Sequence, residues 1–174
     1  MEDFTKKDSI LNGSDVCFTN QVLRLQKREQ MVFCLKDDGD TLHTVSLMDG
    51  EVYLCQKREV IDVLKPERLS NMEKLQLSQI RPFGALDVSK HSPKYSGYGF
   101  LSDGRHASGV WLCSIEEVRN YIQMQKDYQH RVLICDRDDF IVMEFIEGQQ
   151  VFPKEQTRQE TLNGQANGEF MILG

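Results

Sequence analysis

The chain has 174 residues, of which 40% are hydrophobic and 28% charged, and its formal net charge is -6. This length fits one domain, which buries roughly 70% of its unfolded surface and needs no disulfide or metal to fold. The acidic balance gives no general attraction to phosphate backbones or anionic membranes. Apolar stretches such as 140–143 are much shorter than the roughly 20 residues of a membrane span, so we expect no membrane insertion.

The cysteine pattern indicates a reducing compartment. The chain has five cysteines, an odd number, and no pair has the Cys-x-x-Cys spacing. Four of the five lie inside apolar runs, and cysteine in such runs packs as a small buried hydrophobic residue. The sequence therefore predicts reduced, unreactive core thiols and a cytoplasmic location. The cysteines are Cys17, Cys34, Cys55, Cys113 and Cys135.

The first part of the chain is predicted to be β-structure. Residues 1–14 are polar, and we expect them to be flexible. A β-rich run at 31–35 is followed by Asp-Gly turn signals at Gly39 and Gly50, and further runs follow at 42–47 and 52–55. Asp-Gly between apolar runs is a strong hairpin signal, so these runs predict an antiparallel meander. A further short strand is expected at 60–64.

Two helices are expected in the remainder. The first begins at Pro66 or at Ser70, which forms a capping-box pattern with Glu73, and it ends before Pro82. Short strands joined by glycine-rich loops occupy 85–113. The second helix covers 114–128, with Ser114 and Glu117 as its capping box.

The chain then continues with a hairpin of strands 131–135 and 140–146, around an aspartate-rich turn. From 153 to 174 it is polar, and we expect a flexible tail in which 170–173 could act as a docking tag. Each helix has one apolar stripe, which suits a helix that covers one face of a sheet. The predicted fold is α+β: a single domain at 15–152 with a largely meandering antiparallel sheet covered by two helices.

One segment differs in composition from the rest of this acidic chain. Residues 81–112 have four basic and two acidic residues, a local charge of +2, together with aromatic residues, two histidines and several glycines. Aromatic and arginine side chains often anchor interfaces, and glycine lets a backbone approach a ligand closely. The same composition is also typical of a β connection whose aromatic rings pack inward. The candidate ligand-binding residues are Arg81, Lys90, Lys94, Tyr98, Phe100, Arg105 and His106.

The run Gly97-Tyr98-Gly99-Phe100-Leu101 resembles the RNP1 strand of the RNA-recognition-motif family. In that family the aromatic side chains lie on one sheet face and stack on bases. The resemblance implies that Tyr98 and Phe100 share a face and bind single-stranded nucleic acid. The expected element order from 60 to 135 is roughly β-α-β-β-α-β, in keeping with it.

Signals for catalysis and for metal binding are weak. His106 and Ser108 alternate on one side of an extended segment, which leaves a small enzyme centred on His106 as a third hypothesis. A solvated loop explains the same residues. The four histidines are widely spaced and no pair of cysteines has a metal-ligand spacing, so we expect no metal and no cofactor.

The leading functional expectation is a non-enzymatic binding or regulatory protein that acts through protein–protein contacts. The alternative is an RNA- or single-strand-binding module that uses residues 81–111. The sequence identifies neither the partner nor the oligomeric state.

Overall fold

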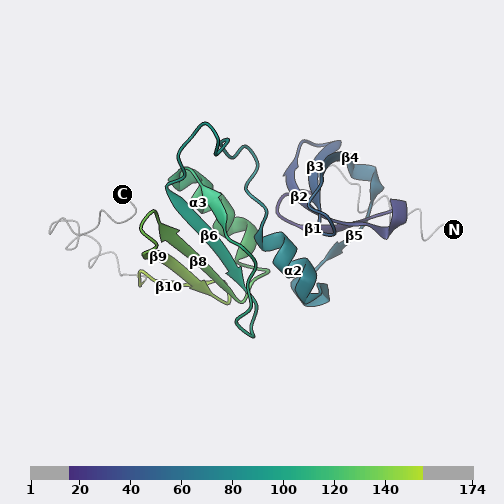
Figure 1. The fold of residues 1–174 in the computed structure, drawn as a ribbon. Coiled ribbons are helices and arrows are strands. Elements are labelled where there is room, and N and C mark those ends of the chain that lie inside the picture. Colours follow the sequence, from purple (N-terminus) through teal and green to yellow (C-terminus); the bar gives the residue numbers. More distant parts are fainter. Residues whose placement is uncertain (1–15, 155–174) are drawn as a thin grey trace, which may run out of the picture.

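A computed structural model describes residues 16–154 of the chain (Figure 1). The flexible N-terminus expected at 1–14 lies outside the described residues. So does the predicted polar tail, apart from Pro153 and Lys154, and so does its possible docking tag at 170–173.

The first sheet is an antiparallel meander with one returning strand. Its order is β4-β3-β2-β1-β5. The two Asp-Gly turns form as predicted. Gly39 and Gly50 adopt φ of 97° and 74°, which glycine tolerates without strain because it has no Cβ. The strands are β1 (Val22–Leu25), β2 (Met31–Asp37), β3 (Thr41–Ser46), β4 (Val52–Gln56) and β5 (Val60–Leu64).

The second sheet is also antiparallel and has the order β10-β9-β8-β6-β7. The predicted hairpin between β8 and β9 is present, whereas β10 has no clear signal in the sequence. The strands are β6 (Tyr95–Phe100), β7 (Val110–Leu112), β8 (Arg131–Asp136), β9 (Ile141–Ile146) and β10 (Gln149–Phe152).

Both predicted α-helices form, and their caps explain where they begin. Pro66 opens a short 3-10 helix, η3 (Pro66–Arg68), and Ser70 then caps α2 (Asn71–Ser78) in a capping box with Glu73. The Oγ of Ser114 accepts a hydrogen bond from the backbone N–H of Glu117 at the start of α3 (Ile115–Gln125). Two further 3-10 helices are η1 (Lys27–Glu29) and η2 (Lys57–Glu59).

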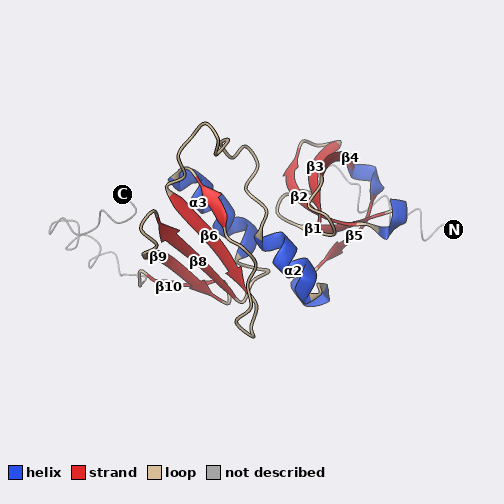
Figure 2. Ribbon diagram, in the orientation of Figure 1, coloured by secondary structure: helices blue, strands red, loops and turns tan. Residues whose placement is uncertain are grey.

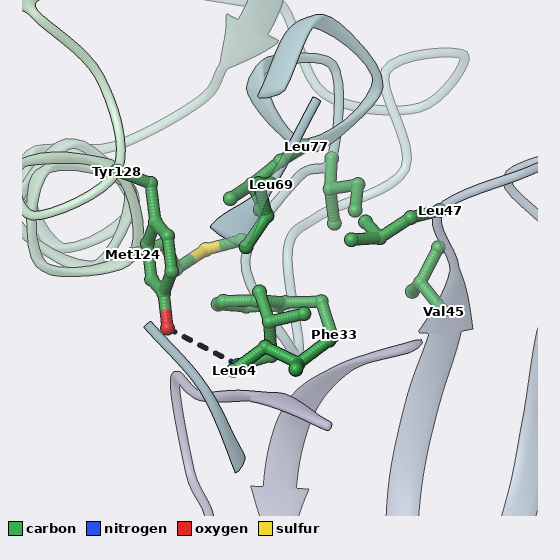
Figure 3. Close-up of a cluster of buried hydrophobic side chains, with 10 residues drawn as sticks. Phe33, Val45, Leu47, Leu64, Leu69, Leu77, Met124 and Tyr128 are labelled. Atoms are coloured by element: carbon green, nitrogen blue, oxygen red, sulfur yellow. Dashed lines mark hydrogen bonds between the residues drawn. The ribbon is translucent and has the colours of Figure 1, made fainter. Parts of the chain in front are cut away.

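A shared core joins the first sheet to both α-helices. α2 lies between them, and α3 covers one face of the second sheet (Figure 2). The largest apolar cluster draws side chains from the first sheet, from α2 and from the end of α3 (Figure 3). The chain is therefore one α+β domain, as predicted. The cluster comprises Val22, Phe33, Val45, Leu47, Leu64, Leu69, Leu77, Ile80, Met124 and Tyr128.

The division of the strands over two sheets was not foreseen. The predicted β-α-β-β-α-β order does occur, as β5, α2, β6, β7, α3 and β8, but it does not build one sheet. β5 pairs with β1 in the first sheet, with Val22 opposite Leu64. The element order therefore agrees with the RNA-recognition motif while the strand pairing does not.

The expected thiol burial is confirmed. Cys34, Cys55, Cys113 and Cys135 are buried and free, and Cys17 is free and exposed. Burial raises the pKa of the Cys34 thiol to about 12 and that of the Cys55 thiol to about 11, which keeps both protonated.

Candidate binding face of the second sheet

The two faces of β6 have different surroundings. Gly97 and Gly99 point toward the helices, where a Cβ at Gly97 would lie 2.7 Å from the Tyr121 ring. A Cβ at Gly99 would lie 2.9 Å from the side chains of Gln129 and Ser78. These two glycines therefore permit close helix packing. Their presence does not indicate a backbone that a ligand approaches, as the composition of the segment had suggested.

The other face of the second sheet has no helix over it among the described residues, and we call it the open face. Because side chains alternate along a strand and paired residues share a face, its members follow from the strand register. They form three rows across the sheet: Trp111, Ser96, Cys135 and Ile141; Tyr98, Leu133, Glu144 and Phe152; Phe100, Arg131, Ile146 and Gln149.

Tyr98 and Phe100 thus share a face, as the RNP1-like pattern predicts, but their rings contact their own chain. The Phe100 ring centroid lies 4.5 Å from that of His106 and 4.8 Å from the Arg131 guanidinium carbon. A Cβ at Gly109 would lie 2.3 Å from the Tyr98 ring, so the 101–109 loop packs directly against Tyr98. The two rings are already engaged by the loop and by β8.

The polar groups around the Phe100 ring are also paired. Nε of Arg131 donates to Oε2 of Glu144 at 2.5 Å. Nδ1 of His106 lies 2.8 Å from the carbonyl oxygen of Ala107, and the His106 ring lies against Phe100. No hydrogen bond within the described part of the chain joins His106 to a carboxylate, the group that would orient a catalytic histidine.

Exposed apolar side chains lie at the edges of the open face. Trp111 is 56% exposed, Ile141 44% and Phe152 42%. The second face of an antiparallel sheet is usually polar, because it meets water. Here exposed apolar side chains stand at the edges of the face, one ion pair joins Arg131 to Glu144, and Ser96, Cys135 and Leu133 between them are buried.

The other predicted basic residues are placed differently. Lys90 and Lys94 are exposed in the segment that leads into β6. Arg105 is exposed and pairs with Asp103, Nε to Oδ2 at 2.8 Å. The hydrogen bonds from the backbone and side chain of Arg105 lower the pKa of Asp103. The charge of Arg105 is therefore partly balanced within its own loop.

Arg81 makes contacts that hold α3 and β7 together. Its Nη2 lies 2.9 Å from Oε1 of Glu117, and its Nε donates to the carbonyl oxygen of Trp111 at 2.8 Å. Glu117 also accepts hydrogen bonds from the backbone N–H groups of Leu86 and Cys113. Its carboxylate therefore ties α3 to β7 and the 81–86 segment, and it does not complete the predicted capping box at Ser114.

The sequence prediction missed the β8–β10 half of the face: Arg131, Glu144, Ile141 and Phe152. A signal for two of them was present. Glu144 lies inside an apolar run and Arg131 stands at the start of one, and a charge at an alternating position marks the solvent side of a strand. Which strands lie beside β6 could not be read from one sequence.

Three further observations concern metals, membrane spans and known proteins. Residues 16–154 contain no group of three or more His, Cys, Asp or Glu side chains that could hold a metal ion. No helix within the described range is long and apolar enough to cross a membrane. Comparison with protein-family models, curated proteins and solved structures gave no match to this chain.

Proposed function

We propose that this chain is a non-enzymatic binding or regulatory protein that contacts a partner protein through the open face. The observation that carries the proposal is the exposed apolar surface of Trp111, Ile141 and Phe152 on a sheet face that no described helix covers. Tryptophan and arginine are enriched among the residues that dominate binding energy. Trp111 would be the anchor, and the Arg131–Glu144 pair would supply polar contacts beside it.

The contacts of the rings favour protein over nucleic acid. A base-stacking platform needs free ring faces and unpaired cations around them. Here Phe100 is already in contact with His106 and Arg131, and Arg131 is paired with Glu144. Glu144 also places a carboxylate on the open face, and a carboxylate repels phosphate groups. The formal net charge of -6 gives no general attraction that would offset this.

Single-stranded nucleic acid remains the alternative because one observation favours it. Lys90 and Lys94 are exposed in the segment before β6, and Trp111 is an exposed aromatic residue. Binding of that kind would weaken steeply with salt, since phosphate contacts release counterions.

The single tryptophan of the chain gives a direct test, because Trp111 fluorescence reports on the open face alone. A single-stranded oligoribonucleotide titrated into the full chain should leave the emission unchanged at low salt. A saturable, salt-sensitive change would support the alternative and overturn the proposal.

The proposal itself is tested by immobilising the full chain and measuring which proteins it retains from nuclease-treated lysate. The wild type should retain a protein that Trp111→Ala loses and that Leu54→Ala keeps. Leu54 is a matched control because it is an apolar side chain, 62% exposed, on the first sheet. Equal retention by the two variants would show that the open face is not the interface.

A cytoplasmic location is part of the proposal. It is supported by four buried, unpaired cysteines within one domain, because proteins of oxidising compartments usually pair theirs.

A further inference from the structure

A hollow lies between the first sheet and α2, away from the open face. It has a volume of about 690 Å³, within the range of binding pockets for small molecules and side chains. Its apolar lining includes Leu47, which is buried in the shared core, and Met31, which packs against that core. The floor is therefore fixed by the packing that joins the first sheet to the helices.

The rim of this hollow is adaptable and apolar. Met48 in the β3–β4 turn is 84% exposed and Met72 in the first turn of α2 is 74% exposed, and both line the hollow. Methionine is flexible and polarizable, and exposed methionines are typical of surfaces that mould around apolar side chains. With both rim side chains so exposed, the hollow is an open groove that suits a stretch of polypeptide better than an enclosed small molecule.

The charges of the lining select the partner's chemistry. Glu29, Asp49 and Glu73 contribute three carboxylates, against one guanidinium from Arg28. Oε1 of Glu73 accepts a hydrogen bond from the backbone N–H of Ser70, and Oδ1 of Asp49 accepts one from Glu51. Backbone donors do not cancel a carboxylate's charge, so the rim stays acidic and favours basic groups beside an apolar anchor.

We propose that this groove, lined by Met31, Leu47, Met48 and Met72, binds an amphipathic helical peptide segment with an apolar stripe and a basic polar face. The apolar side chains of the segment would lie on Leu47 and Met31 between the two exposed methionines. Its lysines or arginines would face Glu29, Asp49 and Glu73. The groove and the open face share no residue, so the two sites are distinct.

The test uses the full chain with ¹³C-methyl methionine and a synthetic helical peptide of leucine and lysine, about 12 residues or three turns long. The methyl resonances of Met31, Met48 and Met72 should shift saturably. Those of Met124 and Met143, which pack in the core clusters, should not. A matched leucine–glutamate peptide should leave all five unchanged. Equal shifts with both peptides, or none with the leucine–lysine peptide, would overturn the proposal.

A pair of exposed substitutions localises the effect without disturbing the core. The double variant Met48→Ser/Met72→Ser should bind the leucine–lysine peptide about tenfold more weakly. Leu54→Ser, also at an exposed apolar position but outside the groove, should bind as the wild type does. Unchanged affinity in the double variant would refute the site.

Two other occupants would reveal themselves in the free protein. If removal of 155–174 moves the methyl resonances of Met31, Met48 and Met72, the groove is occupied by the chain's own segment. If dilution moves them, it is occupied by a second copy. Either result would contradict a peptide partner.

Discussion

The hydroxyl oxygen of Tyr128, after α3, accepts a hydrogen bond from the backbone N–H of Val22 in β1 at 3.1 Å (Figure 3). The two residues are 106 positions apart, and the bond is buried within the core that joins the first sheet to the helices. Tyr128 therefore ties the second half of the chain to the first sheet.

Tyr128→Phe should lower the free energy of unfolding by about 1–3 kcal/mol. The substitution keeps the ring in the core and leaves a buried N–H without a partner, which costs the desolvation of that group. Equilibrium urea unfolding of the full chain measures the change. An unaltered unfolding midpoint would mean that the Val22 N–H finds another acceptor.

Tyr53→Phe should have the opposite effect on the free energy of unfolding. Its hydroxyl is buried and has no hydrogen-bond partner, and burial raises its pKa to about 12. Removal of an unsatisfied buried hydroxyl should therefore raise the free energy of unfolding, by about 1 kcal/mol. The same urea experiment tests it. A loss of stability would show that the hydroxyl is satisfied in solution.

Gly97→Ala tests whether glycine in β6 serves packing. The new methyl group would lie 2.7 Å from the ring of Tyr121, which is fully buried and whose hydroxyl donates to the Ser78 carbonyl oxygen. Overpacking of this kind typically costs about 1–3 kcal/mol, so thermal unfolding should occur at a lower temperature. An unchanged melting temperature would show that α3 shifts freely away from the sheet.

Local elements of the fold could be predicted because their signals are local. Asp-Gly turns, capping residues and apolar alternation lie within a few neighbouring residues, and they placed β2 to β5, α2, α3 and the β8–β9 hairpin. The partition into two sheets depends on the pairing of β5 with β1, near Leu64 and Val22. Such a pairing between distant segments leaves no trace in periodicity.

The candidate site was predicted in part for the same reason. Alternation alone puts Tyr98 and Phe100 on one face, and the structure agrees. It does not reveal that His106 and Arg131 lie against Phe100, because these contacts join different segments. Arg81 was grouped with the site by charge, whereas its partner Glu117 lies 36 residues further along the chain.

Arg81→Ala should separate stability from binding. The Glu117 carboxylate is only 8% exposed, so the loss of its guanidinium partner would leave a poorly compensated charge and cost about 2 kcal/mol or more. The open face should still bind its partner, because Arg81 bonds the backbone carbonyl of Trp111 and not its exposed side chain. Urea unfolding and retention of the partner in nuclease-treated lysate give the two readouts. Weaker binding at a temperature where the variant is fully folded would indicate that Arg81 is part of the binding site.

Asp37 should make stability depend on pH in acid. Its carboxylate is buried beside Lys57, with Nζ and Oδ2 2.9 Å apart. Burial raises the Asp37 pKa, but hydrogen bonds from the Phe18 N–H, Lys57 and the Gly39 N–H outweigh it, and the net shift is downward. A carboxyl whose folded pKa lies below its unfolded value stabilises the fold above the unfolded pKa, near 4, and loses that contribution as the pH falls through the folded pKa.

The free energy of unfolding of the wild type should therefore decline as the pH drops below about 4. In Asp37→Asn the decline should be smaller, from a lower starting value, because Lys57 loses its charged partner. Urea unfolding of both proteins across this pH range measures the difference. Asp87 provides a comparison, since its pKa is also lowered but it is exposed and bonded locally to Ser89, so Asp87→Asn should reduce the acid decline less than Asp37→Asn does. Parallel curves for wild type and Asp37→Asn would contradict the assignment of the acid dependence to the buried pair.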